Sequence, residues 1–181
     1  MIQKFEKLEQ KVIRKSNILE YCDYVMKTPD GNIVHYDMML HKGASAVVPV
    51  TDDGKILMVR QYRPAIDQIT LEIPAGGRDS KEEPYRVAAM RELEEETGYR
   101  CERLEHLITI VTAIAYCDEK IEVYVAQNLK PTRQDLDEDE YIDVEAFELD
   151  ELKRMIFNAE IIDNKTIASI LAYSEKYCRQ V

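Results

Sequence analysis

The N-terminal third of the chain alternates between hydrophobic and polar positions in short runs separated by turn residues. Residues 17–26 and 32–40 alternate on either side of a Pro-Asp-Gly sequence at 29–31, which predicts two antiparallel strands joined by a turn. Residues 44–50 and 55–62 predict the next pair, because the Asp-Gly dipeptide between them is typical of a tight hairpin. The chain therefore begins with hairpins rather than with strand–helix–strand crossovers.

The rest of the chain predicts one long helix followed by more strands and two final helices. In the helix at about 82–97, Met90 and Leu93 lie at helical spacing and are assigned to the core. Pro84 suits the first helical position, and Gly98 suits the left-handed residue that ends the helix. The other predicted elements are strands at about 70–73, 107–116, 120–126 and 140–149, and helices at about 149–158 and 163–177.

This order of elements predicts an α/β (α+β) fold in which helices cover both faces of a mixed sheet, an α/β/α sandwich. Residues 1–42, with the N-terminal antiparallel strand pair, precede the main domain at 43–181, and no linker or internal repeat is visible. The first strands carry Tyr21, Tyr24 and Tyr36, which is more aromatic surface than a free arm should expose. We therefore expect another surface to cover them.

Composition and charge exclude several classes of function. The formal net charge of −11 at pH 7 and the absence of a basic run argue against a nucleic-acid partner. No apolar stretch approaches the roughly 20 residues needed to span a membrane, so we expect no membrane partner and a cytoplasmic location. A P-loop, a G-x-S-x-G elbow and a dinucleotide fingerprint are all missing from the sequence.

A cluster of glutamates on the long helix predicts a site for a divalent metal ion. Residues three and four apart share one face of a helix, so Glu92, Glu95 and Glu96 converge while Glu94 points elsewhere. Carboxylates this close repel one another, and hard oxygen ligands favour Mg²⁺, with Mn²⁺ as the alternative, over zinc. Arg91 lies within the cluster, and we interpret it as the ion-pair partner that orients these carboxylates.

The spacing around this cluster resembles the Nudix signature, G-x5-E-x7-R-E-U-x-E-E-x-G-U, in which U is an apolar residue. Gly77, Glu83 and the run RELEEETGY at 91–99 match every fixed position. A solvated acidic helix end, the ordinary alternative, would have to match all of these positions by chance. From about residue 16 onward the chain is similar to the ADP-ribose pyrophosphatase branch of the Nudix hydrolases, in the segments 61–64, 71–76, 118–119, 138–140 and 163–166.

The resemblance implies hydrolysis of the pyrophosphate of a nucleoside diphosphate linked to a second group. ADP-ribose is the first candidate, with AMP and ribose 5-phosphate as products. The implied metal ligands are the backbone carbonyl of Ala75 and the side chains of Glu92, Glu95, Glu96 and Glu140. The implied catalytic residues are Glu138 as general base, Glu95 and Arg91, with Asp137 and Asp139 as alternatives to Glu138.

The resemblance also implies that Arg63 contacts the diphosphate, a role that suits the fork of a guanidinium. Its ordinary alternative is a surface arginine at a strand end. Arg60 lies nearby, and Tyr36 stands where the family tends to offer an arginine to the partner subunit's ligand, so it is expected to stack on a base. These three are the candidate substrate-binding residues. The family resemblance further implies a homodimer in which the N-terminal strands of each subunit complete the other's site.

Two departures leave the substrate open. Ile114 replaces a proline that ADP-ribose pyrophosphatases usually carry, and Tyr36 replaces the arginine. A hydrolase of another nucleotide sugar such as GDP-mannose is therefore the main alternative. A non-catalytic module that binds ADP-ribose, or a purely structural interaction protein, would leave the complete set of carboxylates without a purpose.

Overall fold

A four-stranded mixed sheet forms the centre of the computed structural model, which describes residues 2–178. Residues 1 and 179–181 of the two predicted domain ranges lie outside it. The parallel pairing of β4 with β9 makes the sheet mixed, whereas its other pairings are antiparallel. In spatial order its strands are β7 (Ala75–Gly77), β4 (Ala44–Pro49), β9 (Lys120–Pro131) and β8 (Tyr99–Val111). A second sheet consists of β10 (Asp143–Phe147), β5 (Ile56–Arg63) and β6 (Gln68–Glu72).

Helices cover both faces of the central sheet, as the hydrophobic pattern predicted. Successive strand residues point to opposite faces, and β4 shows the result. Its Val47 packs with Leu93 of α1 (Tyr85–Thr97), whereas Val48 belongs to the cluster that holds Ile170 of α3 (Asn164–Tyr177). Helix α2 (Leu149–Phe157) adds Leu152 to that second cluster. The α/β/α sandwich and the mixed α+β class are therefore confirmed.

Helix α1 differs from the prediction at its start and on its buried face. Pro84 is extended, with φ −64° and ψ 135°, and precedes the first helical residue instead of occupying it. Met90 was assigned to the core, but it is 44% exposed. Gly98 does end the helix in the left-handed conformation, with φ 71°, and its N–H bonds to the carbonyl of Glu94. The buried positions fall in pairs four apart, at 88–89, 92–93 and 96–97, so the buried stripe includes Glu92 and Glu96.

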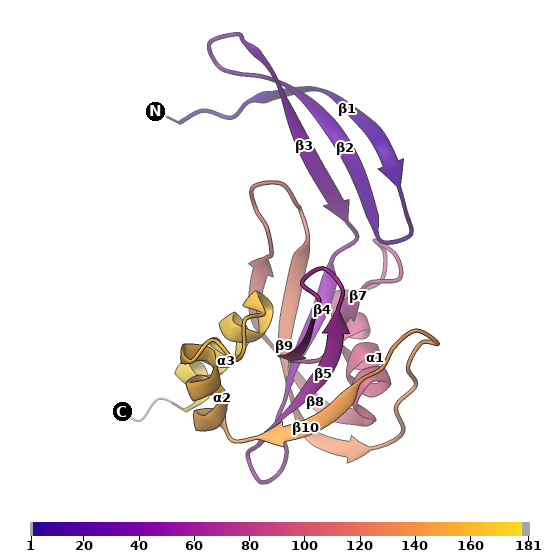
Figure 1. Cartoon of the computed structure of the whole chain (residues 1–181), viewed down its shortest axis with the longest axis vertical. Helices are drawn as coiled ribbons and strands as arrows, with labels where there is room; N and C mark the ends of the chain where they lie inside the picture. Colours follow the sequence, from indigo (N-terminus) through magenta and orange to yellow (C-terminus); the bar gives the residue numbers. More distant parts are fainter. Residues whose placement is uncertain (1, 179–181) are drawn as a thin grey trace.

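The N-terminal sheet has three strands, one more than the predicted pair. These are β1 (Glu6–Lys15), β2 (Leu19–Lys27) and β3 (Ile33–His41), all antiparallel. Every residue of β1 is exposed and most of its side chains are charged. Its sequence therefore lacks the alternation of buried hydrophobic and exposed polar residues that would predict a strand. Figure 1 shows this sheet projecting from the rest of the molecule. Hydrogen bonds from Asp118 N to the Met39 carbonyl and from His41 N to Asp118 Oδ1 join its base to the body.

The remaining elements agree with the sequence in order and differ in their bounds. The strand predicted at 107–116 begins at Tyr99 and ends at Val111, because residues 112–116 form a turn closed by hydrogen bonds to the Ala113 carbonyl. The strand predicted at 140–149 is shorter, Asp143–Phe147. Figure 1 shows α2 and α3 on the opposite side of the central sheet from α1. Within residues 2–178, no helix is both long enough and apolar enough to cross a bilayer.

Candidate active site

Backbone hydrogen bonds hold the loop from β6 into β7 against both α1 and β4. The N–H of Ala75 donates to Glu96 Oε2 at 2.9 Å, and the carbonyl of Pro74 accepts a bond from Val47 N, also at 2.9 Å. A Cβ atom at Gly76 would lie 2.2 Å from the carboxyl carbon of Glu92. A side chain at position 76 would therefore displace the carboxylate of Glu92 from its present place.

A polar cavity of about 500 Å³ opens between this loop, α1 and the acidic segment after β9. It brings together residues that the sequence places far apart. The predicted site residues that line it are Arg63, Ala75, Arg91, Glu92, Glu95, Glu96 and Glu140. Further side chains that were not assigned a role from the sequence also line it, namely Ile18, Gln61, Asp79 and Asp135. Asp137, an alternative to Glu138, lines it as well.

Arg91 ties the cluster of carboxylates together. Its Nη1 donates to Glu92 Oε1 and to Glu95 Oε2, each at 2.8 Å, and its Nη2 donates to the Gly77 carbonyl at 2.9 Å. Its Nε contacts Glu83 Oε1 at 3.4 Å. Burial opposes the charge of Arg91, but the neighbouring glutamates, Glu92 above all, raise its pKa. These contacts fit the orienting role proposed for Arg91.

Two of the carboxylates are buried without enough positive charge around them. Burial raises the pKa of Glu92 to about 7, even though Arg91 lowers it. Burial likewise raises the pKa of Glu96 to about 8, against the opposing hydrogen bond from Ala75 N. The charge of Glu140 raises both values further. A cation bound among these groups would relieve this cost.

The oxygen donors of this cavity fit a hard divalent cation in chemistry and in charge. Within residues 2–178, no three His, Cys, Asp or Glu side chains are already gathered as a ligand set. Arg91 engages Glu92 and Glu95, while the Ala75 amide engages Glu96. Carboxylate and carbonyl oxygens are nevertheless the ligands that Mg²⁺ and Mn²⁺ prefer. Binding an ion would require these glutamate side chains to turn from their present partners toward the cavity.

Arg63 is held by a second network of buried charges. Its Nε and Nη2 donate to the two carboxylate oxygens of Glu72 at 2.8 and 2.7 Å. Glu72 is 2% exposed and also accepts bonds from Thr70 Oγ1 and from the ammonium of Lys165. Burial alone would raise the pKa of Glu72, but Arg63 and Lys165 lower it to about 2.

The acidic loop contributes Glu140 to the cavity but not Glu138. Glu140 lines the cavity and accepts a bond from the backbone of Asp137 at 3.2 Å. Glu138 lies in an exposed turn and is not among the lining residues. Asp137 does line it, and it was one of the alternatives to Glu138. The structure therefore brings the loop to the site, while the identity of the base stays a prediction.

Two of the three candidate substrate-binding residues lie outside this cavity. Arg60 pairs with Glu145 of β10. Because strand residues alternate, Gln61 and Arg63 share the face toward the cavity and Arg60 takes the opposite one. Tyr36, on β3, is 43% exposed and its ring packs near that of Phe5 at 6.5 Å. Within one chain, neither Arg60 nor Tyr36 lines the cavity, and their roles in substrate binding stay predictions.

Gln61 and Ile18 are two of the lining residues that sequence reasoning missed. The side-chain nitrogen of Gln61 is buried and has no hydrogen-bond partner among the described residues. Its spacing of two from Arg63 on a predicted strand was a usable signal. Ile18 belongs to the turn between β1 and β2, and no sequence pattern pointed to it.

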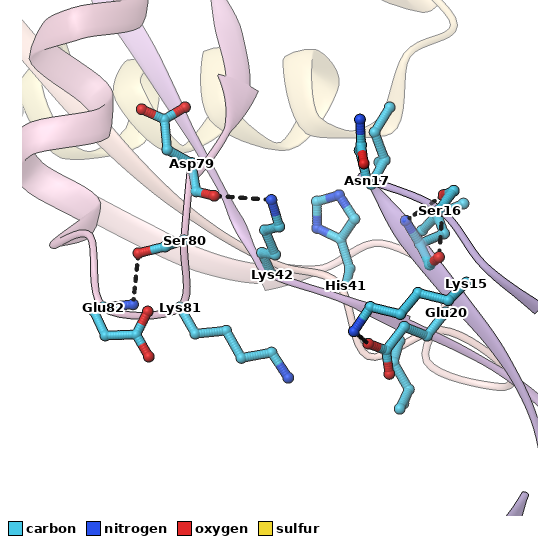
Figure 2. A pocket seen from close by; sticks show the side chains of 13 residues that line it. Lys15, Ser16, Asn17, Glu20, His41, Lys42, Asp79, Ser80, Lys81 and Glu82 are labelled. Carbon is cyan, nitrogen blue, oxygen red and sulfur yellow. Dashed lines mark hydrogen bonds and ion pairs between the residues drawn. The ribbon is translucent and has the colours of Figure 1, made fainter. Parts of the chain in front are cut away.

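A second hollow, of about 480 Å³, adjoins the cavity at Ile18 and Asp79. Figure 2 shows that Lys42 points across it to the backbone carbonyl of Asp79, a bond of 2.8 Å. Its three lysines face an equal number of acids, so it has no excess charge of either sign. These lining residues are Lys15, Lys42 and Lys81 with Glu20, Asp79 and Glu82.

Comparison with known proteins identifies the family. Residues 39–169 match the model of the NUDIX domain, so the chain belongs to the Nudix family and is a Nudix hydrolase. It is 36% identical over 171 residues to the ADP-ribose pyrophosphatase of Bacillus subtilis, covering 90% of this chain and 91% of that protein. It is 42% identical over 147 residues to the methanol dehydrogenase activator of Bacillus methanolicus, covering 80% and 79%. The resemblance drawn from the sequence is confirmed.

The fold is also shared with a solved structure. A crystal structure of an ADP compounds hydrolase superposes with a TM-score of 0.84 and covers 97% of this chain and 95% of its own. At 23% sequence identity this likeness concerns the fold alone.

Proposed function

We propose that this Nudix hydrolase cleaves the pyrophosphate of a nucleoside diphosphate sugar in a reaction that needs Mg²⁺ or Mn²⁺, with ADP-ribose as the first candidate substrate. The observation that carries the proposal is a single cavity lined by Arg63, by the loop with Ala75 and by three glutamates of the Nudix signature, Glu92, Glu95 and Glu96. Similarity to ADP-ribose pyrophosphatases from Bacillus subtilis and Mycobacterium tuberculosis supports this choice of substrate.

The residues of the cavity and of the acidic loop beside it would have different roles in the reaction. Glu92, Glu95 and Glu96 with the Ala75 carbonyl would hold the metal, with Glu140 beside them. Such an ion neutralises the diphosphate and lowers the pKa of a bound water. Arg63 binds the phosphate oxygens. An acid of the loop, Glu138 in our prediction, accepts the proton of the attacking water as its oxygen bonds to phosphorus and the bridging P–O bond breaks.

A hydrolysis panel tests this proposal. ADP-ribose, GDP-mannose and other nucleotide sugars are incubated with Mg²⁺, Mn²⁺ or excess chelator, and the products are separated by chromatography. We expect AMP and ribose 5-phosphate from ADP-ribose and no turnover in chelator. Preferred cleavage of GDP-mannose would replace ADP-ribose as the substrate. Binding of ADP-ribose without cleavage of any compound would identify a non-catalytic module instead.

We also propose that the protein is a homodimer. The N-terminal strands at 1–42 of each subunit would complete the site in the catalytic domain, residues 43–181, of the other. The strand register places Val12, Cys22 and Met38 side by side on one face of the N-terminal sheet, with Tyr24 and Tyr36 next to them. Val12 is 48% and Tyr36 43% exposed in the single chain. A second copy that covers this face would bring Tyr36 toward the partner's nucleotide.

Sedimentation and kinetics test the dimer. We expect a dimer at micromolar concentration and a rise in KM for Tyr36→Ala that corresponds to about 1–3 kcal/mol of lost stacking. Tyr177→Ala, which removes an exposed tyrosine at the C-terminal end of α3, is the control. A fully active monomer would exclude a site shared between subunits.

Activation of a dehydrogenase is a second candidate function. It is favoured by the 42% identity to the protein named methanol dehydrogenase activator. Adding the purified protein to a methanol dehydrogenase and measuring its rate tests this candidate, with the Glu95→Gln variant separating a catalytic effect from simple binding.

A further inference from the structure

The N-terminus of α3 is bonded to the end of β6, directly before the loop that carries Ala75. Asp163 caps the helix, and its Oδ2 accepts bonds from Thr166 N at 3.0 Å and Thr166 Oγ1 at 2.6 Å. Thr166 Oγ1 in turn accepts the N–H of Ile73 at 3.0 Å. Thr166 and Ile73 are fully buried, so these bonds are shielded from water.

Lys165 joins the same helix end to Glu72. It is 7% exposed, and its ammonium contacts the Glu72 carboxylate and lies 2.9 Å from Asp163 Oδ2. With Arg63 on the other side of Glu72, two cations and two anions form a balanced group. Removing one member of such a buried group leaves its neighbours with an uncompensated charge.

The arrangement leaves part of Arg63 available to a ligand. A guanidinium has five N–H bonds, and Glu72 uses one on Nε and one on Nη2. Nη1 donates to no group within the described chain. Arg63 also lines both the carboxylate cavity and an adjoining one of about 620 Å³ that includes Glu72 and Lys165. Its three remaining N–H bonds are therefore the ones that a phosphate oxygen can accept.

We propose that Lys165 is a positioning residue for substrate binding, which fixes the guanidinium of Arg63 through the shared Glu72. The inference rests on the proposed function, because it presumes a diphosphate in the cavity. Without Lys165, the Glu72 carboxylate loses a contact that holds it in place against Arg63, and an uncompensated negative charge remains at Glu72 and Asp163 near the diphosphate. Lys165 therefore leaves the remaining N–H groups of Arg63 available to the substrate while Arg63 stays bonded to Glu72.

Kinetics of Lys165→Met, alone and combined with Arg63→Met, test the proposal. The methionine keeps the length of the side chain and removes its charge. We expect KM for ADP-ribose to rise about tenfold while kcat changes less than threefold, and we expect no further rise when Lys165→Met is added to Arg63→Met. Lys153→Met, on α2 and paired with Asp150, is the matched control and should leave KM unchanged. Equal rises in both backgrounds would overturn the proposal.

A spectroscopic measurement keeps the test independent of turnover and of folding losses. The Nε–H resonance of Arg63, assigned by its loss in Arg63→Met, should exchange slowly in the wild type and faster in Lys165→Met. If Lys165→Met does not fold, the double variant Glu72→Gln/Lys165→Met is compared with Glu72→Gln alone. The two should have the same KM, because Lys165 acts on Arg63 only through Glu72. An unchanged resonance and KM in Lys165→Met, or a higher KM in the double variant than in Glu72→Gln, would overturn the proposal. A wild type that cleaves no nucleotide sugar refutes the proposed function instead, while the resonance still tests the role of Lys165.

Discussion

Replacing Glu96 by glutamine should stabilise the metal-free protein and abolish its activity. Glu96 is 4% exposed and keeps a single backbone bond, from Ala75 N, which a glutamine oxygen can also accept. The substitution removes the charge and keeps the volume. The change in the free energy of unfolding therefore measures what the buried negative charge of Glu96 costs in the absence of metal.

The size of the effect follows from the pKa of Glu96, which is about 8 in the folded protein against an ordinary 4.5. At about 1.4 kcal/mol for each pH unit, the ionised group costs at most about 5 kcal/mol of stability at pH 8. Part of this shift comes from the charge of Glu92, whose own pKa of about 7 means that it takes up a proton in the same range, so about 3 kcal/mol is the expected gain for Glu96→Gln. In a chain of this length that raises Tm by about 6–12 °C.

The sign of the pH dependence is fixed by the direction of the shift. Between pH 4.5 and 8 the folded state retains a proton that the unfolded state has released, so wild-type stability falls as pH rises through this range. The variant lacks this group. The difference between the two proteins should be small at pH 4 and largest at pH 8.

Thermal unfolding in chelator at several pH values measures this difference. Glu94→Gln, at a half-buried position of the same helix and paired with Arg100, is the control and should lower stability slightly. Adding Mg²⁺ should raise the Tm of the wild type more than that of Glu96→Gln. A gain that is the same at pH 4 and pH 8, or no gain at all, would refute the account of Glu96 as an uncompensated buried charge.

Three further predictions address the loop, the base and the buried ion pair. Gly76→Ala should lower kcat/KM on the order of 10²-fold, because its Cβ would displace Glu92; activity within twofold of wild type would contradict this. Glu138→Gln should lower kcat by about 10²–10⁴ with KM nearly unchanged, whereas a loss confined to Glu140→Gln would move the base to that position. With a folded pKa of about 2, Glu72 stabilises the protein fully above about pH 4.5 and loses this effect as pH falls toward 2, so acid unfolding monitored by circular dichroism should be less steep in Glu72→Gln than in wild type.

The fold could be predicted because its elements have local signals. The hairpin turn at Gly54, with φ 85°, and the helix end at Gly98 both have a left-handed backbone that favours glycine. Both positions could therefore be recognised in the sequence. Strand β4 buries all of its residues, which produces a hydrophobic run. Strand β1 has no such signal, because pairing with β2 satisfies its backbone while its side chains stay in solvent. Its place in the fold follows from pairing alone.

The candidate site was predictable where spacing determines direction and less so elsewhere. Glu92, Glu95 and Glu96 lie on a helix, and helical spacing alone placed them together. Arg60 and Arg63 are three positions apart on a strand, so they point to opposite faces, and applying that alternation to the sequence would have placed Arg60 away from Arg63. In the loop at 135–140 no regular period operates. The choice among its acids therefore depends on tertiary contacts.

The incorrect core assignment on α1 is itself informative about function. A helix that packs on a sheet ordinarily buries its apolar residues, and Met90 was assigned to the core on that basis. The structure instead buries Glu92 and Glu96 and leaves Met90 at the surface. Burying two carboxylates costs stability, as their raised pKa values show, and an arrangement that only had to fold would have turned the helix to bury Met90. Places where the local hydrophobic pattern disagrees with the fold are expected at functional sites. On α1 that disagreement coincides with the wall of the cavity, which is the face where a divalent ion would supply the missing positive charge.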